Sequence, residues 1–170
     1  MKFTVLGKYG PYPPESGATS GYLLECAGLK ILLDCGSGTA ARLQRLTDLE
    51  DLDAVVLSHL HQDHMSDLGV LNYAMQMLTK KGLRRGKLPV YLPGEPADVR
   101  TMIQGFDHME ASVYGERLDF PGLPQSFARC GIQSPAMPCS FKVRGERFFI
   151  PGTPPILKDL QSLSKVRTAR

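Results

Sequence analysis

The amino-acid sequence predicts a single α/β domain spanning residues 1–170. Short apolar runs, several of them rich in β-branched residues, alternate with segments in which apolar residues recur at helical spacing. The 17 glycines and 13 prolines among 170 residues indicate many tight turns. With 42% hydrophobic and 22% charged residues, the chain has the composition of a globular protein that can bury a core.

The expected elements follow from these patterns in chain order. The Val-rich run at 52–57 is typical of a strand buried on both faces. Apolar residues at 68, 71, 75 and 78 predict a helix over 66–79. Ala27-Gly28-Leu29 separates two apolar runs and indicates a hairpin. In full, strands are expected at 2–6, 22–26, 30–34, 52–57, 89–92, 112–114, 126–129, 140–143 and 147–150, and helices at 39–46, 66–79, 96–106 and 156–163.

Bulk charge and the cysteines restrict the class of protein. A net charge of +3 is too small to argue for a nucleic-acid partner by itself. The first residues lack the long apolar stretch of a secretory signal, and no segment approaches the length of a membrane span. We therefore expect a cytoplasmic protein with no membrane partner. Its cysteines, expected to be reduced and buried as small apolar residues, are Cys26, Cys35, Cys130 and Cys139.

The run Ser58-His59-Leu60-His61-Gln62-Asp63-His64 carries the strongest chemical signal. On an extended segment, side chains i and i+2 point the same way, so His59 and His61 can bind one cation together. Asp63 and His64 come where the chain turns toward a helix, and this turn directs their side chains at a metal position next to the first. Imidazole and carboxylate ligands suit zinc, and also manganese or iron. The predicted metal ligands are therefore His59, His61, Asp63 and His64.

This histidine run after an apolar strand resembles the signature of the metallo-β-lactamase superfamily, in the bacterial branch related to ribonuclease Z, the tRNA 3′-end-processing nuclease. Flanking sequences agree, namely Gly10-Pro11-Tyr12-Pro13-Pro14, Gly17-Ala18-Thr19-Ser20-Gly21-Tyr22, Leu33-Asp34-Cys35-Gly36-Ser37-Gly38 and Asp67-Leu68. The resemblance implies an αββα sandwich, here missing its C-terminal elements, with two zinc ions. It assigns His59 and His61 to one ion, and Asp63 and His64 to the other. It also makes Asp63 the catalytic residue that orients the attacking water, with Asp34 holding a histidine by its far nitrogen.

The second half of the sequence departs from the family pattern. The family completes its site with a further His, a bridging Asp and a last His near the C-terminus. The best match for the first is Ser134, the second falls in Gly152-Thr153-Pro154, and no histidine follows His108. His108 could complete the site only by departing from the family pattern. Three explanations stay open: a degenerate or truncated homologue with little catalysis, a homo-oligomer such as a dimer that shields an exposed sheet edge, or a protein with one ion or none and another role.

The expected function is a metal-dependent hydrolase, with a phosphodiester such as an RNA end as the leading substrate. Hydrolysis of a small ester, lactone or thioester is the nearest chemical alternative, because fold does not determine substrate. A non-catalytic metal-binding or interaction protein is the alternative from another class, motivated by the three absent ligands. The basic run Lys80, Lys81, Arg84, Arg85 and Lys87 is interpreted either as a phosphate contact or as a solvated loop. Ser16, Ser37 and Ser58 show no Ser-His-Asp arrangement that competes with the metal motif.

Overall fold

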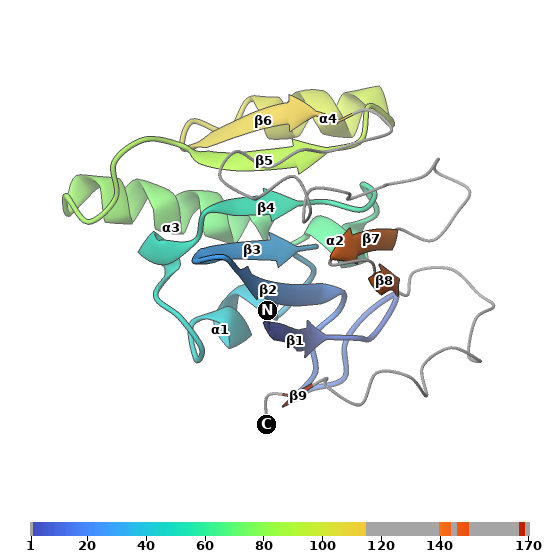
Figure 1. Ribbon diagram of the computed structural model, residues 1–170. Coiled ribbons are helices and arrows are strands. Elements are labelled where there is room, and N and C mark those ends of the chain that lie inside the picture. The colour runs from blue at the N-terminus through green and yellow to red at the C-terminus, as the bar shows by residue number, and fades with distance from the viewer. Residues whose placement is uncertain (1, 115–139, 144–145, 150–166, 169–170) are drawn as a thin grey trace. The chain divides into compact units, whose positions relative to one another are not determined.

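The computed structural model describes residues 2–114, 140–143, 146–149 and 167–168 (Figure 1). The chain divides into two compact units, residues 1–113 with 166–170 and residues 114–165. The prediction of a single domain over 1–170 therefore stays a prediction. Three sequence expectations lie outside the described residues: the strand at 126–129, the helix at 156–163, and the positions of Ser134, Gly152-Thr153-Pro154, Cys130 and Cys139.

The first unit is built on a mixed sheet of seven strands in the order β6-β5-β4-β3-β2-β1-β9. Antiparallel pairing joins β1 to β2 and β2 to β3, and parallel pairing joins β3, β4, β5 and β6 in turn. The short β9 pairs with β1 in parallel. The strands are β1 (Lys2–Gly7), β2 (Gly21–Cys26), β3 (Leu29–Leu33), β4 (Ala54–Val56), β5 (Leu88–Leu92), β6 (Met109–Val113) and β9 (Arg167–Thr168).

Three helices pack on one face of this sheet, the far face in Figure 1. They are α1 (Thr39–Leu43), α3 (Leu68–Lys80) and α4 (Ala97–Gln104); a single turn, α2 (Gln62–Met65), and a 3-10 turn, η1 (Leu49–Asp51), complete the unit. The register places Leu23, Leu32, Val55 and Val90 side by side across four strands. These side chains form the core with Leu43, Leu71, Met75 and Ile103 of the helices.

The opposite face of the sheet is apolar and buried as well. Alternate residues of the central strands point to this face, and each is at most 6% exposed: Tyr22, Leu24, Ile31, Leu33, Ala54 and Val56. Burial on both faces explains why these strands read as continuous apolar runs and not as alternating ones. The interpretation of the Val-rich segment as a doubly buried strand is confirmed.

Most expected elements in the described residues are confirmed, with small changes at their ends. The β2–β3 hairpin closes through Ala27 (φ 52°) and Gly28 (φ 86°), the positive φ pair of a tight two-residue turn. The helix expected at 39–46 ends at Leu43. The strand expected at 112–114 begins earlier, at Met109, because it pairs along β5 from Leu88 onward. The turn α2, the 3-10 turn η1 and strand β9 were not expected from the sequence.

The second unit is described only through one hairpin. Strands β7 (Ser140–Val143) and β8 (Glu146–Phe149) pair antiparallel, from Ser140 with Phe149 to Val143 with Glu146. Both strands were expected from the sequence.

The mixed sheet and its helices confirm the predicted α/β class. Across the part of the chain that the structure describes, no helix has the length and apolar character needed to cross a membrane.

Candidate metal centre

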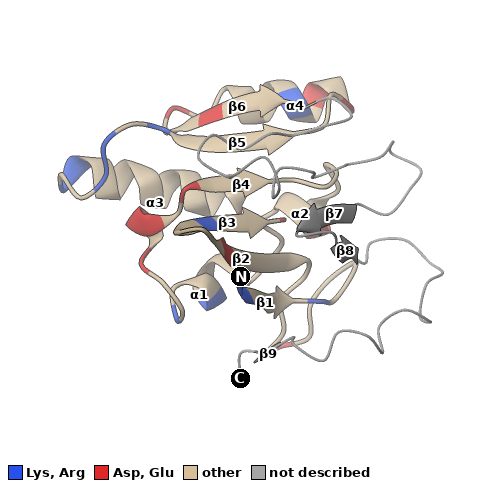
Figure 2. Ribbon diagram, viewed as in Figure 1, with Lys and Arg blue, Asp and Glu red and all other residues tan. Residues whose placement is uncertain are grey.

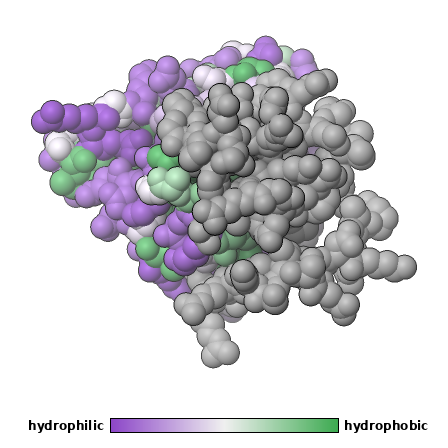
Figure 3. Space-filling view, viewed as in Figure 1, coloured by the Kyte–Doolittle hydropathy of each residue, from purple (hydrophilic) through white to green (hydrophobic). Residues whose placement is uncertain are grey.

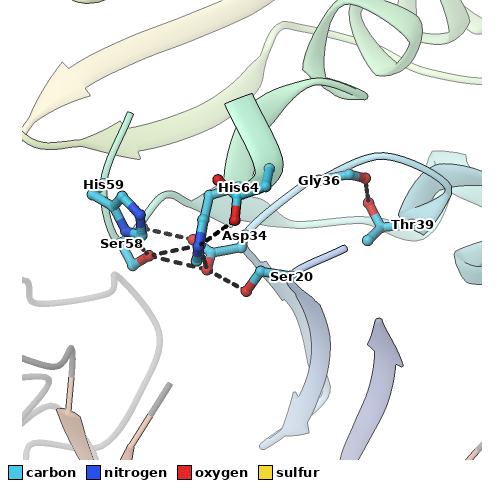
Figure 4. Close-up of polar contacts among 8 residues, drawn as sticks. Ser20, Asp34, Gly36, Thr39, Ser58, His59 and His64 are labelled. Atoms are coloured by element: carbon cyan, nitrogen blue, oxygen red, sulfur yellow. Dashed lines mark hydrogen bonds and ion pairs between the residues drawn. The ribbon is translucent and has the colours of Figure 1, made fainter. Parts of the chain in front are cut away.

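The histidine run lies at the carboxyl ends of the parallel strands β3 and β4. Asp34 follows β3 and Ser58 comes two residues after β4, so both reach the same edge of the sheet. The chain then passes through His59 and His61 into the single turn α2, which carries Asp63 and His64. Figure 4 shows Ser20, Asp34, Ser58, His59 and His64 gathered around one point. Strand ends meeting at one edge of a parallel sheet are the usual place for a ligand site.

Asp34 is the centre of the hydrogen bonding. Its side chain is fully buried (0% exposed) and its backbone has φ 56°, a left-handed conformation that Asp tolerates better than most residues. Oδ1 accepts a hydrogen bond from the Ser58 amide at 2.8 Å. Oδ2 contacts the Ser20 hydroxyl at 2.9 Å, the Ser58 hydroxyl at 3.0 Å and His64 Nδ1 at 2.6 Å. A buried charge needs this many partners to offset its loss of hydration.

His59, Asp63 and His64 form a group that could hold a metal ion, with ligand atoms all within 4.8 Å of one another. His64 Nε2 lies 3.6 Å from Asp63 Oδ2. The rings of His59 and His64 have centroids 3.7 Å apart. Because Nδ1 of His64 is hydrogen-bonded to Asp34, only the Nε2 atom of that ring is available to a cation. Metal-binding histidines commonly have a carboxylate bonded to the other ring nitrogen in this way.

His61, the fourth expected ligand, lies beside this group of three. His61 is exposed, stands at the N-cap of α2 and is not among the three grouped residues, although its ring lies 4.7 Å from that of His59. His59 and His61 lie outside any strand, although the backbone at His61 is extended (φ −76°, ψ 151°). The roles of His59, His61, Asp63, His64 and Asp34 in metal binding stay predictions. His108 precedes β6 and so lies at the opposite, amino-terminal edge of the parallel strands.

Backbone hydrogen bonds attach the histidine segment to a distant part of the chain. The Cys35 amide donates to the His64 carbonyl at 2.7 Å, and the Ser20 amide donates to the Asp63 carbonyl at 3.2 Å. Gly36 lies so close that a Cβ there would be 2.0 Å from the Asp63 carbonyl oxygen. Only glycine therefore fits beside α2, which explains the glycine in Asp34-Cys35-Gly36.

Gly36→Ala should lower the free energy of unfolding by about 1–3 kcal/mol, because the added methyl must displace the Asp63 carbonyl or the Thr19 hydroxyl. Gly69→Ala is the matched control, since a Cβ at Gly69 in α3 meets nothing within 4 Å. The control should raise stability by about 0.5–1 kcal/mol through helix propensity. Urea denaturation of the two variants tests both signs, and equal stabilities would contradict the close approach at Gly36.

Burial affects two titratable groups beside the site. It lowers the pKa of the His59 imidazole, the neighbouring His64 lowers it further, and Asp34 opposes the change. His59 thus favours the neutral form, which is the form that binds a metal ion. Burial raises the pKa of the Cys35 thiol well above its usual range. The described cysteines Cys26 and Cys35 are free and buried, as expected from the sequence.

The glycine-rich loop before β2 also borders the group. A Cβ at Gly10 would lie 3.0 Å from Asp63 Oδ2. The exposed Tyr9 and Tyr12 flank Gly10 in sequence, with 42% and 77% of their surface accessible. The backbone at Gly10 therefore lies next to the Asp63 carboxylate.

The basic run lies away from these histidines. Lys80, Lys81, Arg84, Arg85 and Lys87 connect the end of α3 to the amino end of β5, where Figure 2 shows several basic residues. Figure 3 shows a mainly hydrophilic surface over the end of α3. The Arg84 guanidinium donates to the carbonyls of Glu50 and Leu52 at 2.9 and 2.8 Å, which is a structural role. An open groove of about 660 Å³ at this edge is lined by Lys30, Glu50, Asp51, Asp53, Arg84 and Arg85 among others.

Two residues of the site were missed by sequence reasoning. Ser20 and Ser58 both donate toward Asp34, and Ser58 Oγ also lies 3.0 Å from His59 Nδ1. Ser58 could have been found from its position next to His59 at the end of a strand parallel to the one that ends at Asp34. Ser20 has no such local signal, because its role depends on the antiparallel pairing of β2 with β3.

Comparison with known proteins agrees with this geometry. "Probable metallo-hydrolase YhfI" of Bacillus subtilis is 44% identical over 99 residues, which cover 58% of this chain and 40% of YhfI. The crystal structure of YhfI matches with a TM-score of 0.64 and 34% identity, covering 67% of this chain and 46% of that one. Ribonuclease Z of Methanopyrus kandleri is 36% identical over 85 residues, 49% of this chain and 30% of that protein. The chain thus spans less than half the length of these relatives.

The match at the level of the family covers most of the described first unit. The family described as the Metallo-beta-lactamase superfamily matches residues 15–119, a range that includes Asp34 and the whole histidine run. The mixed α/β sheet, the placement of Asp34 behind His64 and the grouped His59, Asp63 and His64 agree with that match. This chain belongs to the metallo-beta-lactamase superfamily.

Proposed function

We propose that this chain binds a divalent cation, zinc first, at His59, Asp63 and His64, as part of a metal-dependent hydrolase. The observation that carries the proposal is the grouping of two imidazoles and a carboxylate within 4.8 Å, with His64 held from behind by Asp34. This donor set fits zinc, and also manganese or iron. His61, exposed beside His59, is proposed as a further ligand, either to the same ion or to a second one.

When bound, such a cation polarises a substrate oxygen and makes water a nucleophile near neutral pH. The residues of the chain position the reacting groups around it. Asp63, with its side chain 22% exposed, can bind the cation through one carboxylate oxygen and accept a hydrogen bond, and then the proton, of an attacking water through the other. Asp34 keeps His64 in one orientation, since its Oδ2 accepts a hydrogen bond from Nδ1 of that ring.

A phosphodiester, such as an RNA end, is the proposed substrate class. The ribonuclease Z of Methanopyrus kandleri supports it by sequence similarity, although YhfI, with the higher identity, carries only the general name of a metallo-hydrolase. A small ester, lactone or thioester is the alternative on the same fold. The Gly10 loop would contact either kind of substrate next to Asp63.

A non-catalytic metal-binding role is the second candidate. It is favoured by the sequence positions at Ser134 and Gly152-Thr153-Pro154, where the resemblance calls for a His and an Asp. Metal analysis of the purified chain separates the two candidates. Two tightly held ions per chain would support the hydrolase, and one weakly held ion would support the second role. No bound metal at any zinc or manganese concentration would overturn the proposed centre altogether.

Turnover of the 170-residue polypeptide on bis-p-nitrophenyl phosphate, with zinc or manganese, should be near background. The reason is that the resemblance calls for an Asp at Gly152-Thr153-Pro154 that would help to hold the metal and position the nucleophile, and positioning supplies much of the rate at such sites. Ser134→His alone should not raise the rate, since Gly152-Thr153-Pro154 would still lack the Asp that the resemblance calls for. Robust metal-dependent turnover that His64→Ala abolishes would contradict this expectation and show that other groups complete the site.

A further inference from the structure

The contacts around Ser58 determine where each hydrogen lies. The Ser58 hydroxyl is 3.0 Å from Asp34 Oδ2 and 3.0 Å from His59 Nδ1. The Ser58 and Asp34 oxygens, 3.0 Å apart, would repel one another unless a hydrogen lay between them. An ionised carboxylate carries no hydrogen, so Ser58 must supply it. The single hydrogen of Ser58 is therefore directed to Asp34.

The hydrogen of His59 follows from that assignment. With its own hydrogen committed to Asp34, the Ser58 oxygen can only accept from His59, so His59 carries its hydrogen on Nδ1. His64 likewise donates from Nδ1 to Asp34 at 2.6 Å, a nearer oxygen than Ser58 Oγ at 3.4 Å. Both rings then present an unprotonated Nε2, the atom that a cation needs.

We propose that Ser58 is a positioning residue that links Asp34 to His59. Its hydroxyl donates a hydrogen bond to Asp34 and accepts one from His59 Nδ1. One buried carboxylate thereby selects the same tautomer in two histidines, directly in His64 and through one hydroxyl in His59. The backbone of Ser58 adds rigidity to this link, because its amide donates to the other oxygen of Asp34 at 2.8 Å. Figure 4 shows the hydroxyl lying between the carboxylate and the two rings.

Ser58→Ala should release His59 from this tautomer while leaving the fold in place, since the amide bond to Asp34 Oδ1 does not involve the hydroxyl. The experiment uses the full chain, metal-free and at mildly alkaline pH, with ¹⁵N-labelled histidine. Two-bond ¹⁵N–¹H correlation spectra report which ring nitrogen of His59 carries the hydrogen. In the unmodified chain we expect Nδ1–H, and in Ser58→Ala a shift of population toward Nε2–H. Zinc affinity of Ser58→Ala should fall about 10–100-fold, the usual effect of losing a partner behind a ligand.

Two further variants separate this link from a general structural role. Ser58→Thr keeps the hydroxyl and should restore both the tautomer and the affinity. Ser20→Ala removes a hydrogen bond from the same Asp34 oxygen without a described contact to His59, and should leave the His59 tautomer unchanged. The proposal is overturned by Nε2–H at His59 in the unmodified chain, by Nδ1–H persisting in Ser58→Ala, or by an equal shift in Ser20→Ala. The inference rests on the proposed metal centre, but the tautomer is read without metal, so either proposal can fail while the other stands.

Discussion

His59→Ala should lower the zinc affinity of this chain by more than about 100-fold. The substitution leaves one imidazole and one carboxylate in the group, and losing a ligand costs more than the 10–100-fold typical of losing a partner behind it. Calorimetric titration with zinc measures the change directly. The matched control is His108→Ala, which removes the same side chain at the opposite edge of the parallel strands and should leave the affinity unchanged.

His61→Ala then distinguishes the two ways of grouping the ligands. If His59 and His61 bind one ion together, as the resemblance implies, His61→Ala should weaken binding as much as His59→Ala. If the ion sits among His59, Asp63 and His64, the loss in His61→Ala should be smaller. Unchanged zinc affinity in His59→Ala would rule out both arrangements.

Asp34→Ala should lower the free energy of unfolding by about 3–5 kcal/mol, the usual cost of removing one partner from a buried charged network. The change leaves the buried Ser20 hydroxyl and His64 Nδ1 without their acceptor, and places alanine at φ 56°. Guanidinium or urea denaturation of the metal-free protein measures the loss. A variant within about 1 kcal/mol of the unmodified chain would contradict it, since that is an ordinary mutational effect.

Asp34→Asn is the informative companion to Asp34→Ala. Asparagine tolerates positive φ and has the same shape, and it returns one acceptor oxygen to the network. We expect a stability between those of Asp34→Ala and the unmodified chain. Zinc affinity should fall in both Asp34 variants, but less than in His59→Ala, because Asp34 acts on the cation only through the imidazoles.

The strands were predictable because their apolar runs are short and bounded by turn residues. Ile31, Leu32 and Leu33 in β3, and Ala54, Val55 and Val56 in β4, are buried on both faces, as such runs predict. The parallel register of these two strands then brings Asp34 and Ser58 to one edge. The position of Asp34 beside a histidine followed from the resemblance, and the structure identifies that histidine as His64.

The local path of the histidine segment was not predictable from its own residues. The backbone is still extended at His61, as expected (φ −76°, ψ 151°), but the sequence did not indicate that β4 ends at Val56 or that the single turn α2 begins at Gln62. The cause lies elsewhere in the sequence, in the amides of Ser20 and Cys35 that donate to the carbonyls of Asp63 and His64. Contacts between residues about thirty or more positions apart leave no trace in the periodicity of a short window.

Those two amide contacts have a consequence for the thermodynamics of metal uptake. The backbone carbonyls of Asp63 and His64 accept hydrogen bonds from the amides of Ser20 and Cys35, and these bonds involve none of the side-chain atoms that would hold a cation. The backbone entropy of ordering Asp63 and His64 is therefore lost when the chain folds, and at the moment of binding it is mainly the side chains that lose freedom. The cost of ordering the backbone should consequently not be subtracted from the affinity for the cation. By linkage, the protein should melt at a higher temperature as free zinc rises, with no accompanying change in helix content.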